Sequence, residues 1–392
     1  MKNFLFGFLC VICFAVNAQT YLTERAKISL LTTAPSDDAV YTLYGHTSIR
    51  IRDSIDANTK FDYIFNYGMF DQSVPNFIYK FVKGETDYML GRYRYNDFES
   101  DRLLLNSSVC EQILNLYPQE IQTILTELMI KSMPENRNYR YNFFFDNCAT
   151  RPALLVEEFI NGNIIYEENL PKTTFRDMIN YCTRNHPWVT FGCDLVLGSP
   201  TDRIVTIKES FFIPEYLKNA WSTAKVENFD GTERSLVLTE HILIENVSDE
   251  VSGKTIFTPL VCSLLLFAVI LLITWVEWKR KKYFRIVDCL LFFVAGMAGC
   301  VLFFLCFVSE HPSIWPNINI VWLHPFHLTA IGLFAIKKLN KVAYWYHFTN
   351  FVALLLMLFA WFFIPQHLNM AFIPLIATFL LRSGYCLIRK NK

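Results

Sequence analysis

The sequence Asp146-Asn-Cys-Ala-Thr-Arg-Pro-Ala-Leu-Leu-Val-Glu-Glu158 sets the architecture of the N-terminal half, because a polar turn here runs into a helix with apolar periodicity. It follows Tyr139–Phe145, an aromatic run that predicts a strand. Either Asn147 or Thr150 is expected to cap the helix. Cys148 therefore lies at or just before the first helical turn. Unpaired backbone N–H groups and the helix dipole favour an anion there, so the position suits a reactive thiolate.

A thiolate nucleophile also needs an imidazole with which it can exchange protons. His46 lies in Tyr41–Arg52, a run of β-branched and aromatic residues that predicts a strand with Tyr44 and His46 on one face. One cysteine and one histidine are weak evidence taken alone, since a lone cysteine is more often a buried structural residue. The helix start and the polar cap around Cys148 favour the catalytic interpretation.

Two further elements are predicted between the histidine and the cysteine. Phe61–Tyr67 predicts a second strand, with an aromatic face and an opposite face that carries Asp62 and Asn66. Ser108–Met133 predicts a helical region that begins with a serine cap. If the two strands are neighbours, Asp62 or Asn66 is the group expected to orient His46.

The composition points to a membrane protein. Hydrophobic residues make up 53% of the 392 residues and charged residues 18%, against averages of about 45–50% and about 25%. The excess is concentrated after Thr255, where five apolar segments approach the roughly 20 residues that cross a bilayer. The predicted spans are Ile256–Trp278, Ile286–Val308, Ile318–Ile336, Ala343–Ile364 and Leu368–Ile388.

Basic residues give the orientation of these spans. The connections after the first and third spans and the C-terminal tail are rich in Lys and Arg, whereas 309–317 and 365–369 contain neither. The positive-inside rule therefore places the C-terminus in the cytoplasm and residues 19 to about 254 outside the inner membrane. Arg382, which interrupts the fifth span, is interpreted as a snorkelling side chain near the cytoplasmic end.

The N-terminus agrees with that orientation. Residues 1–18 combine a basic start, an apolar run and Val-Asn-Ala18, the form of a cleavable export signal. Cys182 and Cys193, in the exported part, either form a disulfide in an oxidising compartment or remain two unpaired thiols. No closely spaced cysteines and histidines indicate zinc, so we expect neither a metal nor a cofactor. A net charge of zero gives no indication of nucleic-acid binding.

Two apolar features have more than one interpretation. His324 and His327 flank Pro325 in the third span, where they either satisfy backbone groups freed by a kink or line an access route for a lipid. Pro75–Phe81, rich in aromatic residues, either packs in a protein core or dips into the outer leaflet. Backbone satisfaction at the kink is the favoured interpretation of the histidines, and core packing is the favoured interpretation of Pro75–Phe81.

These motifs resemble a known family. The order of a histidine on an early strand and a later Asn-Cys at a helix start is similar to the permuted NlpC-type papain-like fold of lecithin–retinol acyltransferase and its relatives. The chain more closely resembles the Lnb-type lipoprotein N-acyltransferases of diderm bacteria. The stretches that carry this likeness are Tyr44–Thr47, Phe65–Gly68, Asp146–Arg151, Asp194–Arg203, Phe211–Leu217, Trp315–Asn319 and Trp322–Pro325.

The resemblance implies an α+β periplasmic domain over residues 19–250 and an all-α membrane domain over residues 255–392. It also implies that Cys148 takes an acyl chain from a membrane phospholipid as a thioester. The chain then passes to the α-amino group of a diacylated lipoprotein's N-terminal cysteine. His46 would act as acid and base, with Asn66 or Asp62 orienting it. The backbone N–H of Cys148 and the hydroxyl of Tyr44 are the candidate oxyanion donors.

Two other functions fit the same residues. A membrane-anchored NlpC-type peptidase or amidase acting on cell-wall peptides would use the same thiol and the same base, although it needs at most one membrane anchor. A non-catalytic envelope assembly factor would make Cys148 structural, so that Cys148→Ser would be almost silent. An apolar crevice from the thiol toward the bilayer would favour acyl transfer over peptide hydrolysis.

Overall fold

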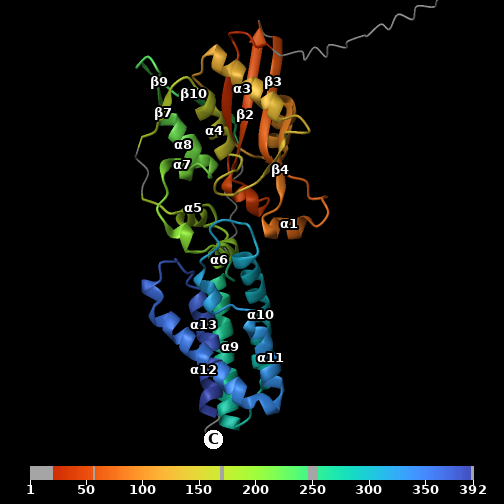
Figure 1. Cartoon of the computed structure of the whole chain (residues 1–392), viewed down its shortest axis with the longest axis vertical. Coiled ribbons are helices and arrows are strands. Elements are labelled where there is room, and N and C mark those ends of the chain that lie inside the picture. The colour runs from red at the N-terminus through yellow and green to blue at the C-terminus, as the bar shows by residue number, and fades with distance from the viewer. Residues whose placement is uncertain (1–20, 56–57, 168–171, 246–254, 390–392) are drawn as a thin grey trace, which may run out of the picture.

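The structure of the protein is a computed structural model that describes residues 21–55, 58–167, 172–245 and 255–389. A mixed α/β part comes first in the chain, and five apolar helical segments follow it (Figure 1). The predicted fold class, α+β followed by an all-α membrane part, is confirmed, whereas the finer assignment to a permuted NlpC fold stays a prediction. The predicted signal segment, residues 1–18, lies outside the described residues.

The N-terminal part is built on a seven-stranded sheet in which every neighbouring pair is antiparallel. In sheet order its strands are β10 (Val237–Ile244), β5 (Val109–Leu114), β1 (Lys27–Thr33), β2 (His46–Ile55), β3 (Asn58–Met69), β4 (Asp87–Arg94) and β6 (Asn138–Arg140). A smaller sheet joins β7 (Asn163–Ile165), β8 (Lys225–Glu227) and β9 (Glu233–Ser235).

Helices cover the two faces of the large sheet unequally. One face, carrying Ile28, Ile49 and Phe65, forms the main core with α3, α4 and α8, and the other packs chiefly against α2. The α/β part contains α1 (Phe77–Lys83), α2 (Tyr95–Leu104), α3 (Pro118–Lys131), α4 (Thr150–Phe159), α5 (Phe175–Cys182), α6 (Pro187–Val196), α7 (Ile207–Ser210) and α8 (Pro214–Thr223).

Three predicted elements differ from the structure, and the simplest case is Tyr139–Phe145, which forms a strand only up to Arg140, the end of β6. The first predicted strand begins only at His46, because Val40–Tyr44 is a short 3-10 helix and Gly45 then turns the chain with a φ of 76°. The predicted helix over Ser108–Met133 is wrong at its start, since Val109–Leu114 is strand β5. The reason is Pro118, whose ring fits the first position of a helix and keeps the preceding residue extended.

The membrane part agrees with the five predicted spans. Its apolar segments are α9 (Pro259–Arg280), α10 (Arg285–Phe307), Ile318–Ala335, α12 (Asn340–Phe359) and α13 (Phe372–Arg389). The third is broken into a 3-10 turn and α11 (Phe326–Ala335) around Pro325. His327 donates its Nε2–H to the carbonyl of Trp322 over 3.0 Å, so this imidazole satisfies a backbone group at the break.

Arg382 does not snorkel. Its side chain is fully buried between α9, α10 and α13, where it binds Glu277 and Asp288, also fully buried. Its Nε lies 2.6 Å from Oδ1 of Asp288, and its guanidinium also donates to Thr274 over 2.9 Å. The two carboxylates lie on α9 and α10, about a hundred residues before Arg382 in the sequence. The sequence of the fifth span alone therefore gave no sign of these partners, and snorkelling was the simplest interpretation.

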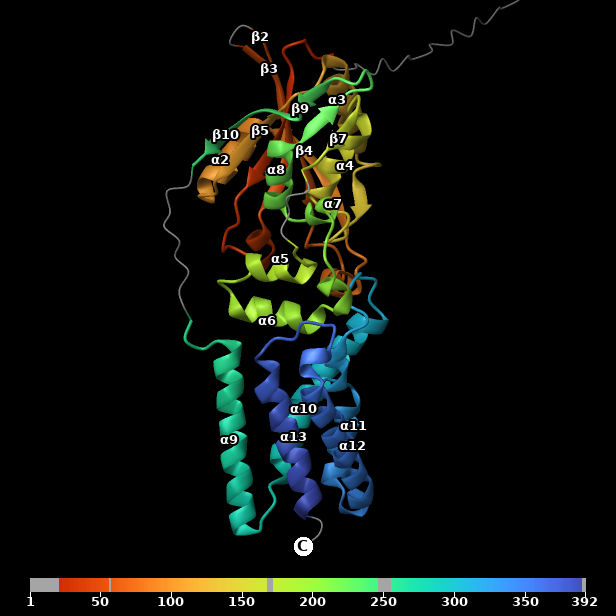
Figure 2. The same cartoon turned by 90° about the vertical axis from the view of Figure 1, so that its left-hand side faces the viewer.

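The sheet stands over the bundle with one end toward it. The β2–β3 hairpin lies at the far end (Figure 2), so the start of β2 and the end of β3 face the bundle. Helix α6 lies across the top of the bundle between α5 and the spans (Figure 2). The ring of Phe191 on α6 packs against Phe372 of α13 with centroids 5.1 Å apart.

Candidate active site

A capped turn holds Cys148 at the start of α4. The side-chain oxygen of Asn147 accepts from the backbone N–H groups of Ala149 and Thr150 over 2.8 and 3.0 Å. The Thr150 hydroxyl accepts in turn from the backbone N–H of Asn147 over 2.8 Å. The sequence left open whether Asn147 or Thr150 caps the helix. In the structure each side chain accepts a hydrogen bond from the backbone N–H of the other residue, as in a capping box. Cys148, between them, is partly exposed.

His46 is held by a second pair of hydrogen bonds. Its Nε2 lies 2.5 Å from Oδ1 of Asn66, and the amide nitrogen of Asn66 donates to the Tyr93 hydroxyl over 3.0 Å. The amide therefore presents its oxygen to the imidazole, so that Nε2 carries the proton. Nδ1 is left to exchange a proton with the Cys148 thiol.

The electrostatics of the pair favour a thiolate facing an imidazolium. Burial raises the pKa of Cys148, but facing His46 and hydrogen bonds from His46 and Thr47 lower it, and the net pKa lies below the ordinary value of a thiol. Burial lowers the pKa of His46, whereas Cys148 and the hydrogen bond to Asn66 raise it above its ordinary value overall. Each group thus favours the charged form of the other.

Gly68 leaves room for this pair at the end of β3. Its φ is 93°, and a Cβ placed on it would lie 3.4 Å from Cβ of Cys148 and 3.8 Å from Cε1 of His46. A side chain here would adopt a strained backbone conformation and would enter the space around the thiol. Gly68, which ends the Phe65–Gly68 stretch of the family likeness, thus borders both Cys148 and His46.

The other two predicted site residues lie elsewhere. Asp62 is four residues before Asn66 on β3, about 13 Å away along the strand, where it binds Arg50 in a bidentate ion pair at 2.7–2.8 Å. The Tyr44 hydroxyl lies 3.8 Å from Sγ of Cys193. The structure therefore brings together His46, Asn66 and Cys148, and directs Asp62 and Tyr44 to other partners.

Three residues around the thiol were missed by sequence reasoning. The hydroxyl of Thr47, directly after the histidine, donates to the backbone carbonyl of Cys148 over 2.5 Å. Burial, and secondarily the nearby Cys148 thiolate, raise the pKa of Tyr139 and of Tyr141, so both phenols stay protonated. The aromatic run before the cysteine was the available signal, but its residues were assigned to a strand that ends at Arg140.

The two other cysteines near this end of the fold are unpaired. Cys182 on α5 and Cys193 on α6 are both free thiols. Burial raises the pKa of Cys182 to about 11 and also raises that of Cys193, which disfavours their thiolates. Of the two possibilities left open by the sequence, the structure has the unpaired thiols.

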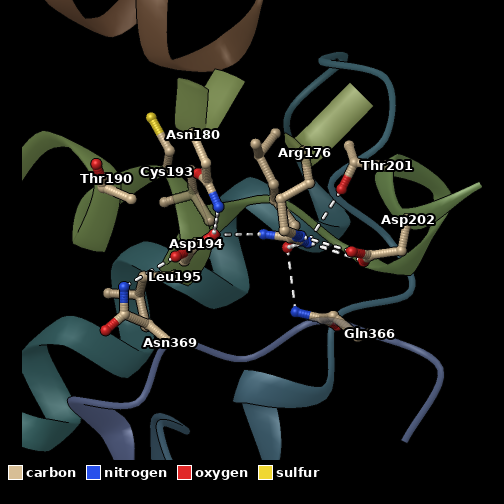
Figure 3. A network of polar contacts seen from close by, with 12 residues as sticks. Arg176, Asn180, Thr190, Cys193, Asp194, Leu195, Thr201, Asp202, Gln366 and Asn369 are labelled. Atoms are coloured by element: carbon tan, nitrogen blue, oxygen red, sulfur yellow. Dashed lines mark hydrogen bonds and ion pairs between the residues drawn. The ribbon is translucent and has the colours of Figure 1, made fainter. Parts of the chain in front are cut away.

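A group of buried polar contacts, the polar junction, joins the periplasmic part to the outer end of the membrane bundle. Buried Arg176 binds Asp194 and Asp202 (Figure 3), with its Nε 2.8 Å from Oδ1 of Asp202. Asp194 in turn accepts from the side-chain amide of Asn369, in the connection before α13, over 2.9 Å. Gln366 donates to the carbonyl of Leu197 over 3.1 Å. The junction links α5, α6 and the outer ends of the spans.

Comparison with known proteins places this architecture in a family. The model described as the Lnb N-terminal periplasmic domain matches residues 15–181, which include His46, Asn66 and Cys148. The model described as the Lnb transmembrane domain matches residues 251–392, which include the five spans. Comparison with curated proteins gives no match, and neither does comparison with solved structures. The chain belongs to the Lnb family and is a multi-pass inner-membrane protein with a periplasmic N-terminal domain.

Proposed function

We propose that the protein is a lipoprotein N-acyltransferase, which moves an acyl chain from a membrane phospholipid to the α-amino group of a lipoprotein's N-terminal lipidated cysteine. Membership of the Lnb family suggests an enzyme of lipoprotein maturation in the membrane. The observation that carries the finer proposal is the group of Cys148, His46 and Asn66 at the end of the sheet that faces the membrane spans.

The first half-reaction forms a thioester. The Cys148 thiolate attacks the carbonyl carbon of a phospholipid ester, and the tetrahedral intermediate expels the glycerol oxygen. That oxygen takes the proton of the His46 imidazolium, so a lysophospholipid leaves and a neutral imidazole remains. Asn66 keeps Nδ1 of His46 directed at the reacting atoms through its bond to Nε2.

The second half-reaction transfers the chain. The α-amino group of the acceptor attacks the thioester, His46 takes a proton from the nitrogen, and the thiolate leaves as the amide forms. The backbone N–H of Cys148 is a candidate oxyanion donor in both steps. The protonated hydroxyls of Tyr139 and Tyr141 replace Tyr44 as the candidate side-chain donors, because both lie near the thiol.

The decisive experiment compares lipoprotein N-termini by mass spectrometry in cells with the native protein, without it, and with Cys148→Ala. We expect triacylated termini only with the native protein. Cys182→Ala, which changes a nearby free thiol outside the site, is the control and should retain triacylation. Unchanged triacylated termini in cells with Cys148→Ala would contradict acyl transfer through this thiol.

A second measurement separates transfer from peptide hydrolysis. Purified protein in phospholipid nanodiscs, given no acceptor, should gain the mass of one acyl chain on Cys148. A cell-wall peptidase would leave the thiol unacylated and would cleave a cell-wall peptide instead. The intact mass of the protein therefore distinguishes the two enzymes directly.

A further inference from the structure

A groove lies between helix α1 of the periplasmic part and α10, the second span. It has a volume of about 1070 Å³ and is lined by Phe77, Ile78 and Tyr79 of α1 and by Met297, Val301 and Phe304 of α10. Pockets for small ligands occupy about 300–1,000 Å³. The α10 residues lie within three turns of that span's periplasmic end, Phe307.

The roof of this groove is fixed to the bundle. The carbonyl of Lys83, at the end of α1, accepts from the backbone N–H of Glu310 over 2.7 Å. Nε2 of His311 lies 2.7 Å from the carbonyl of Phe81. Two carbonyls in the last turn of α1 are thus bound by the loop that follows α10. The groove is therefore a fixed feature of the fold.

The side chains of α1 suit a lipid surface. Ile78 is 78% exposed, Tyr79 54% and Phe81 48%, which would be unfavourable in water for so short a helix. Lys80, on the same helix, has no ionic partner among the described residues. An ammonium group beside exposed aromatic side chains at bilayer level matches the phosphate and the acyl chains of a phospholipid.

A series of aromatic rings leads from the groove toward the thiol. Phe77, in the groove, stacks on Phe70 with centroids 5.8 Å apart, and Phe70 lies 5.1 Å from Tyr88. Tyr88 stacks on Tyr141 with ring centroids 4.0 Å apart, and burial, followed by the charge of the Cys148 thiolate, raises the pKa of Tyr141. Phe70 also comes directly after β3, two residues beyond the Gly68 that borders the catalytic pair.

We propose that the α1–α10 groove binds an acyl chain of the donor phospholipid and leads its ester past the aromatic series to Cys148, with Lys80 at the level of the phosphate. This assignment rests on the proposed acyl transfer. On this assignment the donor leaves the bilayer at the groove, and α1 forms the membrane-facing roof of the groove.

Two substitutions should close the groove without touching the catalytic group. Ile78→Trp and Val301→Trp each add bulk to one wall, and Val301 is 55% exposed. Leu265→Trp is the matched control, because Leu265 is 53% exposed and lies six residues from the periplasmic end of α9, as Val301 does from that of α10. The control residue does not line the groove.

The first measurement is acylation of Cys148, followed by intact mass, in vesicles of phosphatidylethanolamine and phosphatidylglycerol. Each groove variant should acylate about tenfold more slowly than the native protein, which corresponds to about 1.4 kcal/mol. Acylation by p-nitrophenyl butyrate, a soluble ester that needs no groove, should stay within about twofold of the native rate. Acylation of Val301→Trp by phospholipid at the native rate would overturn the proposal.

A binding measurement keeps this inference separate from the chemistry. Protein with Cys148→Ala is irradiated in vesicles that contain phosphatidylethanolamine with a diazirine on one acyl chain, and the labelled peptides are identified. Labels on residues 72–82 and 297–304, lost in Val301→Trp, are the expected result. Labels confined to other spans would refute the assignment, as would labelling of the groove only by a photoreactive diacylated lipopeptide. A labelled groove in native protein that never acylates Cys148 would support the lipid site and overturn the transferase.

Discussion

Among single residues, Asn66 is the one whose role the geometry defines most narrowly. It bonds Nε2 of His46, and Tyr93 fixes the direction of its amide. The sequence left Asn66 and Asp62 as equal candidates because both lie on one face of β3. Only the register, which pairs Asp62 with Arg52, shows that Asp62 lies far from the start of β2.

This geometry predicts a pH effect for Asn66→Ala. The active ion pair forms as the pH rises through the lowered pKa of Cys148, and it is lost as the pH rises through the raised pKa of His46. The bond to Asn66 raises the pKa of His46, so its removal should move the alkaline limb of the acylation rate to lower pH. Loss of one charge-assisted hydrogen bond, about 1.5–3 kcal/mol, should also slow acylation about ten- to hundredfold.

The matched comparison for that variant is Asp62→Asn. Asp62 binds Arg50, so its loss should lower stability and leave both limbs of the pH profile unchanged. Acylation of Cys148 by p-nitrophenyl butyrate across the pH range provides the profile. An alkaline limb that moves in Asp62→Asn and not in Asn66→Ala would exchange the roles assigned to the two residues.

Among the secondary-structure elements, the spans were predictable and several strands were not. A span is identified by the summed hydropathy of about twenty residues, a signal that local exceptions such as Arg382 barely change. Strand β5 is only six residues long, and its place between β1 and β10 depends on partners distant in the sequence. Its Val-Cys-Glu-Gln-Ile-Leu pattern has no strict alternation, and Pro118 was the one local sign that the helix starts later.

Arg382 illustrates the same limit and gives an element-level prediction. Arg382→Leu would leave Glu277 and Asp288 buried without their shared cation, and breaking a buried pair costs about 3–5 kcal/mol. We therefore expect a markedly lower unfolding temperature in detergent and looser packing of α9 against α13. Arg389→Leu, which changes an exposed arginine two turns further along the same face of α13, should have little effect. Equal small losses in both variants would restore the snorkelling interpretation.

In the molecule as a whole, function depends on how the periplasmic part is seated on the bundle. The amides of Asn317 and Asn319 donate to the carbonyls of Asp194, Leu195 and Val196 over 3.0–3.2 Å. These carbonyls belong to the last turn of α6, where a helix has no internal donors. The membrane part therefore completes a helix of the periplasmic part, and the sequence could not show this because the two partners are more than a hundred residues apart.

The last prediction concerns the hydrogen bonds by which Asn317 and Asn319 hold the end of α6. Replacing Asn317 and Asn319 together by alanine removes four hydrogen bonds from the end of α6, at about 0.5–1.5 kcal/mol each. Backbone hydrogen exchange in α6 should become at least about tenfold faster. Acylation of Cys148 from bilayer phospholipid should slow, because the thiol is no longer held at a fixed height above the leaflet, whereas acylation by p-nitrophenyl butyrate should be unchanged.

Asn350→Ala is the control, since Asn350 is equally buried but bonds Ser383 within the bundle. It should leave exchange in α6 and both acylation rates unaltered while lowering the stability of the spans. Equal slowing with phospholipid and with the soluble ester in the junction variant would mean that the junction shapes the catalytic group itself. Slowing with phospholipid alone would assign it to positioning, which the contacts favour because no junction residue touches Cys148, His46 or Asn66 among the described contacts.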